Sequence, residues 1–392
     1  MKPIVIVGSG LAGYTVAREL RKLDAATALV VVSRDEASFY SKPMLSNALG
    51  AGRSAAQIAN ATAAQMAEQL NARVLASTEV QAIDTDGHVV HAAGEAIGYA
   101  KLVLALGADP ISLPMAGDAA GEVLQVNDLA GYARLRAALE GKRRVALLGA
   151  GLIGCEFAND LAAAGYGVEV IDPAPRPLGR LLPEVAAERV RTALESLGVR
   201  WHFGTTASAV ARAPSGLRVT LASGKAIEAD VVLSAIGLRP RTGLAQRAGL
   251  KVARGIVTDR QLQTSAGEVY ALGDCAEVQG HVLPFVMPIM HAARALAKTL
   301  SGIPTPVVYP AMPVVVKTPA IPAVVCPPPA VPGAWRVTED AAGVEACFED
   351  GAGRPLGFAL VGAACARKNS LAKLVPPVLA QRCDSQKPLR LR

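Results

Sequence analysis

Two glycine-rich stretches of this sequence have the composition and spacing to bind a dinucleotide. Each follows a short aliphatic run, in PIVIVGSGLAG and RVALLGAGLIG, and has the spacing G-x-G-x-x-G. The first glycine of such a turn allows a tight bend, the second lets a pyrophosphate approach the backbone, and the third lets the next helix pack closely on the strand. The N–H groups and the dipole at the start of that helix attract phosphate. The expected contacts are Gly8, Ser9, Gly10, Leu11, Ala12 and Gly13 in the first glycine turn, and Gly149, Gly151, Leu152, Ile153 and Gly154 in the second.

An acidic residue about 20 positions after each turn is expected to bind the nucleotide ribose. After the second turn, Asp172 ends a strand-like run. A carboxylate there pairs with a ribose 2′-hydroxyl and repels a 2′-phosphate, which favours NAD over NADP, although Arg176 follows closely and could soften the preference. After the first turn, Ser33 holds the strand-end position. We expect it to contact the first cofactor together with Arg34 and Asp35, which comes slightly late.

The elements around both turns predict two βαβ units. The expected strands and helices are Lys2–Val7, Gly13–Leu23 and Thr27–Ser33 in the first unit, and Val145–Leu148, Gly151–Ala164 and Val168–Ile171 in the second. Two further runs, Tyr99–Pro110 and Asp230–Pro240, read as buried strands that end in a glycine turn and return to a sheet. Each follows a stretch of short alternating strands, Val74–His91 or Arg218–Ile227. The pattern predicts an α/β fold with two similar Rossmann-like domains, one inserted in the other.

The length of 392 residues suggests two or three domains. We expect a discontinuous first domain of residues 1–109 and 236–308, a second of 110–235, a small α+β domain of 309–380, and a loose basic tail at 381–392. Residues 304–332 contain ten prolines, which is usual for a linker. Their VVVK and PAVVC runs nevertheless predict edge strands. These continue into strands at Trp335–Val337, Val344–Phe348 and Gly357–Val361 and a helix at Ala366–Leu374.

Composition limits the classes of function. Hydrophobic residues make up 51% and charged residues 19%, which indicates a folded chain. The net charge of +7 suits either simple solubility or attraction to an acidic partner, while 4% aromatic residues and no basic recognition helix argue against nucleic acid. The first strand begins too early for a secretory signal, and the uncharged stretches are too rich in proline to span a membrane, so we expect a cytoplasmic protein. The six cysteines form no C-x-x-C pair, and neither a metal site nor a disulfide framework is expected.

These segments together resemble the two-dinucleotide flavoprotein reductases, which bind FAD and NAD(P)H. The block GEVYALGDCAE at Gly267–Glu277 carries much of the likeness. Within this group the chain is similar to the rubredoxin–NAD reductase family, from about residue 3 to 380. The segments that carry this likeness are YSKPMLS (Tyr40–Ser46), AEQLNAR (Ala67–Arg73), GLIGCEFANDL (Gly151–Leu161), SAIGLRPRT (Ser234–Thr242), VMPIM (Val286–Met290) and VVVKTPA (Val314–Ala320). The resemblance implies a glutathione-reductase-like architecture, with FAD on the first glycine turn and NAD(H) on the second.

The resemblance also implies roles for residues outside the turns. Asp274 would bind the ribityl chain of FAD, Lys42 and Lys317 would lie beside the flavin, and Glu156 would face the junction of flavin and nicotinamide, where it could pair with Lys42. The other implied contacts are Pro43, Val80, Gly107, Gly273 and Val286 to FAD, and Gly237 to NAD. Simpler alternatives stay open: Asp274 as the cap of a following helix, Lys42 as a surface side chain, Lys317 as an edge-strand lysine that blocks aggregation, and Glu156 as a helix-dipole partner.

The resemblance implies electron transfer from NADH through FAD to the one-electron iron carrier rubredoxin, which is typically acidic. Disulfide reductases of this superfamily place a cysteine pair after the first FAD unit or in the NAD domain, whereas Phe39–Leu49 contains no cysteine. Cys155 and Cys275 are therefore expected to be packing residues. Two alternatives stay open: a reductase of a ferredoxin or flavorubredoxin, and a flavin-bound redox sensor or interaction protein with little turnover.

Overall fold

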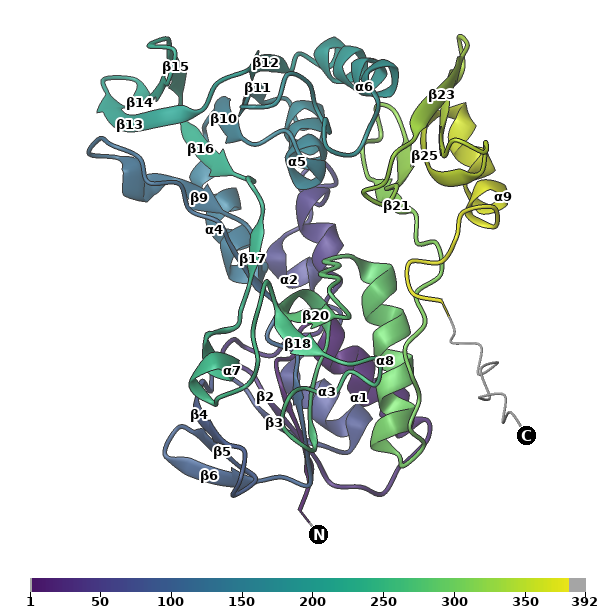
Figure 1. The fold of residues 1–392 in the computed structure, drawn as a ribbon. Helices are drawn as coiled ribbons and strands as arrows, with labels where there is room; N and C mark the ends of the chain where they lie inside the picture. The colour runs from purple at the N-terminus through teal and green to yellow at the C-terminus, as the bar shows by residue number, and fades with distance from the viewer. Residues whose placement is uncertain (1, 381–392) are drawn as a thin grey trace.

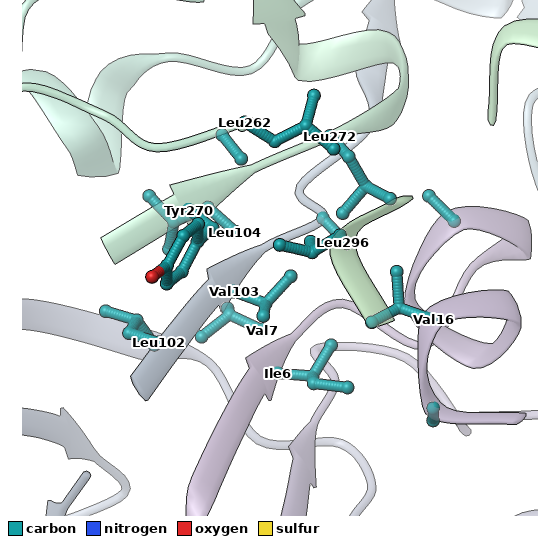
Figure 2. Packing of buried hydrophobic residues seen from close by; sticks show 14 of the residues in the cluster. Ile6, Val7, Val16, Leu102, Val103, Leu104, Leu262, Tyr270, Leu272 and Leu296 are labelled. Atoms are coloured by element: carbon teal, nitrogen blue, oxygen red, sulfur yellow. The ribbon is translucent and has the colours of Figure 1, made fainter. Parts of the chain in front are cut away.

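The first five-stranded sheet of the computed structural model, which describes residues 2–380, is built around the first glycine turn (Figure 1). Its strands run parallel in the order β19 (Val269–Ala271), β7 (Lys101–Leu104), β1 (Ile4–Val7), β2 (Leu29–Val32) and β3 (Arg73–Leu75). The inner strands β1, β2 and β7 are mostly aliphatic because both faces of a parallel sheet are buried. Figure 2 shows Ile6 and Val7 of β1 packed with Leu102 to Leu104 of β7, Val16 of α1 (Leu11–Arg21) and Leu296 of α8 (Val286–Leu300).

The second five-stranded sheet repeats this plan around the second glycine turn. Its parallel order is β12 (Arg200–Phe203), β11 (Gly167–Asp172), β10 (Arg144–Leu148), β16 (Val231–Ser234) and β9 (Leu124–Gln125). In each unit a three-stranded antiparallel sheet precedes the fourth strand. These sheets are β4 (Val80–Asp84), β5 (Val89–Ala92) and β6 (Glu95–Gly98), and β13 (Ala207–Ala213), β14 (Gly216–Leu221) and β15 (Ala226–Ala229). The two predicted βαβ units and their closing strands are confirmed.

The closing strands also connect the two halves of the molecule. β8 (Ala108–Pro110) pairs antiparallel with β17 (Leu238–Pro240), with Asp109 opposite Arg239. Figure 1 shows β17 between the half that contains β2 and β3 and the half that contains β10 and β11. The chain therefore leaves the first half and returns to it through neighbouring strands, as expected for one domain inserted in another.

The C-terminal part forms an antiparallel five-stranded sheet in the order β21 (Val314–Val316), β22 (Ala323–Cys326), β25 (Pro355–Gly362), β24 (Gly343–Glu349) and β23 (Ala334–Glu339). The prediction that both proline-flanked runs are edge strands is correct for β21 and wrong for β22. β22 pairs with β21 on one side and β25 on the other, which it can do because its prolines flank the strand rather than interrupt it. One face of the sheet shares a core with α6 (Glu184–Ser196) and the second large sheet.

The other face of this sheet packs on the last helical segment. The predicted helix at Ala366–Leu374 is shorter in the structure, where a 3₁₀ turn, η4 (Ala363–Arg367), leads into α9 (Lys368–Ala372). Val375 precedes a proline, and such a residue is disfavoured in the helical conformation, so the helix cannot continue past Leu374. The expected basic tail, residues 381–392, lies outside the described residues.

The remaining elements connect these sheets or pack beside them. They are η1 (Lys42–Ser46), α2 (Ala55–Ile58), α3 (Ala63–Leu70), η2 (Ala120–Glu122), α4 (Leu129–Leu139), α5 (Leu152–Ala163), α7 (Gly243–Arg247), β18 (Ile256–Thr258), η3 (Gly273–Cys275) and β20 (Ala276–Val278). Within residues 2–380, no helix has both the length and the apolar character needed to cross a membrane.

Candidate functional site

The first glycine turn joins β1 to α1 and has the geometry of a phosphate-binding loop. Gly8 has φ +112°, and a Cβ built on it would lie 2.2 Å from the carbonyl oxygen of Ala105. A Cβ on Gly13 would lie 1.8 Å from the carbonyl oxygen of Gly8. Gly10 is the N-cap of α1, and a Cβ there would meet no atom of residues 2–380 within 4 Å. The start of α1 therefore faces open space, with backbone N–H groups available to a phosphate.

Behind this turn, two hydroxyl groups and a carboxylate form a short hydrogen-bonded chain. Ser9 Oγ lies 2.6 Å from Ser33 Oγ, and Ser33 Oγ donates to Asp35 Oδ1 at 2.6 Å. Ser33 directly follows β2, so it lies at the strand end as predicted. The guanidinium of Arg34 lies 3.4 Å from the carboxylate of Asp109, in the connection between the two halves. The structure therefore brings Ser33 and Asp35 to the glycine turn, whereas Arg34 is directed toward β8.

The second glycine turn has the same geometry. Gly149 has φ +103°, and its Cβ would lie 2.7 Å from the carbonyl oxygen of Ala235. A Cβ on Gly154 would lie 2.0 Å from the carbonyl oxygen of Gly149, whereas one on Gly151 would meet none of the described atoms within 4 Å. Ile153, in the first turn of α5, is 40% exposed although it is apolar. A dinucleotide can approach this helix start as it can the first.

Asp172 is the last residue of β11 and links the strand end to the second turn. Its carboxylate accepts hydrogen bonds from the backbone N–H groups of Ala150 at 2.6 Å and Ala174 at 2.7 Å. Arg176, which could have attracted a 2′-phosphate, forms an ion pair with Glu184 at 2.8 Å. The expected preference for a 2′-hydroxyl is therefore supported by both side chains.

The Gly-Asp pair expected to hold FAD lies against the first turn. Gly273 has φ +78°, and its Cβ would lie 2.9 Å from the Cβ of Ala12 in the first turn of α1. Val286, at the start of α8, is 39% exposed. The alternative in which Asp274 caps a directly following helix is wrong. Residues 276–278 pair with β18 as strand β20, so the chain is extended there and α8 begins only later.

Three other predicted contacts lie in turns or at the start of a strand. Gly107 and Gly237 have φ +71° and +121°, and they form the turns between β7 and β8 and between β16 and β17. Val80 is buried at the start of β4. The segment before it is held to the end of β2, since the N–H of Thr78 donates to the carbonyl oxygen of Ser33 at 2.7 Å.

Lys42 begins the 3₁₀ turn η1, and its closest acid is not the one predicted. Its Nζ lies 3.8 Å from Asp274 Oδ2, and its side chain is 33% exposed. Partial burial lowers the pKa of Lys42, and the nearby Asp274 carboxylate opposes that shift. The prediction that Lys42 pairs with Glu156 is wrong because that carboxylate already has a lysine partner.

That partner is Lys317, which directly follows β21. Its Nζ donates to Glu156 Oε2 at 2.6 Å and to the carbonyl oxygen of Pro43 at 2.6 Å. The backbone N–H of Lys317 donates to Glu156 Oε1 at 2.9 Å, and the Glu156 side chain is fully buried. The prediction that Lys317 needs a negative partner is confirmed, and a role limited to blocking an exposed sheet edge is not supported.

Four further polar residues belong to this region, and the sequence interpretation assigned no role to them. They are Ser46, Asn159, Asp160 and Arg241. Ser46 Oγ donates to Glu156 Oε2 at 2.5 Å, and Asp160 accepts from two backbone N–H groups, those of Leu49 and Gly50, at 2.9 Å each. Burial raises the pKa of Asp160. Asn159 and Asp160 lie three and four residues after Glu156, and this helical spacing of polar residues in an apolar helix was a signal that could have found them.

Arg241, from the SAIGLRPRT segment, bonds to the β7–β8 segment beside the closing strands. Its Nε lies 2.6 Å from Asp109 Oδ1, and its Nη1 donates to the carbonyl oxygen of Leu106 at 2.8 Å. Its charge also lowers the pKa of Lys42, so the two cations are near one another.

The two cysteines that follow cofactor motifs are packed in the core. Cys155 and Cys275 are both fully buried, and burial raises the pKa of each thiol, that of Cys275 to about 11. The five cysteines among residues 2–380 are all free. The prediction that these two residues fill space is confirmed by their burial.

A continuous line of contacts connects the two glycine turns. η3 contacts the start of α1 through Gly273, and it approaches η1 through the Asp274–Lys42 pair. η1, α5 and the end of β21 then meet at the Glu156–Lys317 pair. α5 then leads back to the second turn. The site fits FAD on the first turn and NAD(H) on the second, because both helix starts are open, acids lie at or near both strand ends and charged pairs connect the two turns.

Two family comparisons cover nearly the whole chain. Residues 2–298 match the family described as pyridine nucleotide-disulphide oxidoreductase, and residues 306–375 match the rubredoxin binding C-terminal domain. The sequence is 51% identical over 381 residues to the rubredoxin-NAD(+) reductase of Alcanivorax borkumensis, which covers 97% of this chain and 100% of that protein. It is 48% identical over 389 residues to the protein of that name from Acinetobacter baylyi, with coverage of 97% and 99%.

Solved structures share the fold. A ferredoxin reductase of Rhodopseudomonas palustris superposes with a TM-score of 0.87 at 25% identity, covering 96% of each chain. Putidaredoxin reductase in its covalent complex with putidaredoxin has a TM-score of 0.87 at 27% identity, covering 96% of this chain and 94% of that one.

Proposed function

The chain belongs to the pyridine nucleotide-disulphide oxidoreductase family, and we propose that it is an NADH-dependent FAD oxidoreductase that reduces rubredoxin. The observation that carries the proposal is the match of residues 306–375 to the rubredoxin binding C-terminal domain. The nearly full-length identity to two rubredoxin-NAD(+) reductases supports it. The net charge of +7 would favour encounter with an acidic carrier.

FAD, when bound, accepts a hydride from NADH and releases electrons one at a time, which suits a one-electron iron carrier. In this proposal, Gly10 and the start of α1 hold the pyrophosphate of FAD, and Asp274 holds its ribityl chain. Gly151 and Asp172 hold NADH and orient it. Lys42 and Lys317 supply fixed positive charge, and their acids hold them in place. The chain needs no side-chain nucleophile, so it contributes orientation and electrostatics.

The domain boundaries are part of the same proposal: residues 1–109 with 236–308 for FAD, 110–235 for NAD(H), and 309–380 for the C-terminal domain. A cytoplasmic location is also proposed. The free thiols of the described cysteines support it, since a reducing compartment keeps thiols from forming disulfides.

The test is anaerobic NADH turnover with purified rubredoxin, ferredoxin and a disulfide substrate, measured side by side. We expect rubredoxin to be reduced fastest and the disulfide not at all, because the two cysteines beside the cofactor motifs are buried. A faster reaction with ferredoxin would overturn the proposed carrier. Slow flavin bleaching by NADH alone would instead indicate a sensor with little turnover. Raising the ionic strength should slow rubredoxin reduction, and a flat salt dependence would remove the steering argument.

A second candidate carrier is flavorubredoxin. The chain is 41% identical over 319 residues to the nitric oxide reductase FlRd-NAD(+) reductase of Escherichia coli, covering 81% of this chain and 84% of that protein. A flavorubredoxin arm in the same turnover experiment distinguishes the two carriers.

A further inference from the structure

Helix α5 carries a buried polar face in the middle of the molecule. Glu156, Asn159 and Asp160 are 0%, 3% and 5% exposed. They are spaced three and four residues apart, so they lie on one face of the helix. Buried polar side chains are costly without hydrogen-bond partners, and here each of them bonds to another segment of the chain.

Asp160 holds the segment that follows η1. Its two carboxylate oxygens accept from the N–H groups of Leu49 and Gly50, at 2.9 Å each. A Cβ built on Gly50 would lie 2.8 Å from Asp160 Oδ1, so the contact is too close for a side chain at this position. η1 carries Lys42, and the carboxylate therefore fixes the segment to which that lysine belongs.

Asn159 and Glu156 hold the segment that follows β21. Asn159 Oδ1 accepts from the N–H of Ala320 at 3.0 Å, and Glu156 accepts from both the backbone and the Nζ of Lys317. Ser46 joins the two segments, because its hydroxyl donates to Glu156 and accepts from Lys317 Nζ at 3.1 Å. Both lysine segments are thus attached to the same side of one helix.

The helix that holds the two lysines begins at the second glycine turn, so its rigid backbone sets their position relative to bound NADH. We infer that Asn159 and Asp160 are positioning residues for hydride transfer: they fix the Lys317 and Lys42 segments to α5 without contacting either cofactor. This inference rests on the proposed cofactor sites. It does not depend on which carrier accepts the electrons, because hydride transfer precedes that step.

The first experiment measures flavin bleaching by NADH in Asp160→Ala under anaerobic stopped-flow conditions. We expect the limiting rate constant to fall about tenfold or more, because small displacements of reacting groups have large kinetic effects, while the NADH dissociation constant stays within about twofold. The flavin midpoint potential should become more negative as the lysine segments loosen. Asp160→Asn, which keeps one acceptor, should lie between Asp160→Ala and the wild type. Asn159→Ala should likewise lower the bleaching rate and leave the NADH dissociation constant nearly unchanged, since it releases the segment that follows β21.

Gly50→Ala tests the same contact from the opposite side and covers the case in which Asp160→Ala does not fold. It should lower the bleaching rate like Asp160→Ala, and the double variant should be no slower than either single variant. Asp84→Ala is the matched control: Asp84 also accepts from two backbone N–H groups, those of Asp86 and Gly87, but in the β4–β5 turn. It should leave the rate and the potential unchanged.

Hydrogen exchange on the FAD-free full-length protein gives a readout that needs no turnover. Peptides that contain Leu49 and Gly50 should exchange about tenfold faster in Asp160→Ala than in the wild type, and peptides from the β4–β5 turn should not change. The inference is overturned if the variants lose only thermal stability while bleaching rate and potential stay at wild-type values. It is equally overturned if the whole effect lies in NADH affinity. Failure of rubredoxin reduction in the wild type, with these shifts intact, would count against the proposed carrier alone.

Discussion

The two nucleotide-binding units have the same backbone design and different polar chemistry. The strands β3, β2, β1 and β7 of the first sheet have the same order as β12, β11, β10 and β16 of the second, and both turns pair a glycine at φ above +100° with a later glycine that accepts no Cβ. At the strand end that follows, the first unit has Ser33 bonded to Ser9 and Asp35, whereas the second has Asp172 bonded to two backbone N–H groups. The backbone of the two turns is therefore shared, and the units differ in the side chains at the strand end, which we propose distinguish the two nucleotides.

The largest effect is expected from adding a methyl group to the third glycine of each turn, which tests whether the two units bind different nucleotides. Gly13→Ala should yield protein with less than about a tenth of the normal flavin content, because its Cβ would lie 1.8 Å from a backbone oxygen at the proposed FAD site. Gly154→Ala, with the corresponding distance 2.0 Å, should keep FAD and lose bleaching by NADH. Visible absorbance per protein and stopped-flow bleaching measure the two effects.

The second glycine of each turn provides the matched controls. Cβ atoms on Gly10 and Gly151 would meet none of the described atoms within 4 Å, so Gly10→Ala and Gly151→Ala should fold with normal thermal stability. Gly10→Ala should weaken only the binding of FAD, and Gly151→Ala only the binding of NADH. Equal loss of flavin in Gly154→Ala and Gly13→Ala would show that the two units do not bind separate nucleotides.

A smaller effect is expected at the acid that distinguishes the second unit. Asp172→Ala removes the proposed charge-assisted hydrogen bond to the ribose, worth about 1.5–3 kcal/mol, so NADH affinity should fall by about tenfold to a hundredfold. NADPH affinity should fall less, since the removed carboxylate repels a 2′-phosphate. Titration of both nucleotides measures the difference. An equal loss for the two would remove the ribose contact and leave Asp172 as a support for the N–H groups of Ala150 and Ala174.

The shared backbone was predictable from the sequence because it depends on local patterns. Glycine spacing, aliphatic runs and the two closing strands each report on residues near one another in the chain, and the structure follows them to within a few residues. The position of a strand within its sheet and the end of a helix were less predictable, because contacts with other segments decide them. β22 is an inner strand because it also pairs with β25, and α9 ends at Ala372, two residues before the predicted end.

The charged pairs of the site were only partly predictable because they join distant segments. The position of Lys317 in an apolar run indicates that it needs an acidic partner, yet no local pattern indicates which acid. The predicted pair of Lys42 and Glu156 does not form, because η1, α5 and the end of β21 meet at this point. Lys317, directly after β21, reaches the buried carboxylate of Glu156. The buried polar face of α5 had a visible helical spacing, but the partners of Asn159 and Asp160 are backbone groups more than a hundred residues away.

A more modest effect is expected when Arg176, which follows Asp172 by four residues, is released from its ion pair. Arg176 pairs with Glu184, whose side chain is 80% exposed, so this ion pair contributes at most about 1 kcal/mol. Glu184→Gln should free the guanidinium for a 2′-phosphate and raise the rate of bleaching by NADPH a few-fold, with the NADH rate unchanged. The ratio of the two bleaching rates is the measurement. If the NADPH rate does not rise at low ionic strength, Arg176 does not face the ribose.

The smallest effect is expected at the two cysteines, one in each unit. Because burial raises the pKa of Cys275 to about 11, only about one thiol in ten thousand would be ionised at neutral pH, and Cys155 is shifted in the same direction. Cys155→Ser and Cys275→Ser should therefore bleach with NADH at rates within about twofold of wild type. Thiol labelling read by mass spectrometry should leave both residues unmodified in the native protein, while the partly exposed Cys365 reacts. Native labelling of Cys155 with loss of bleaching would restore a redox role to the second unit and make the two units differ in chemistry as well as in nucleotide.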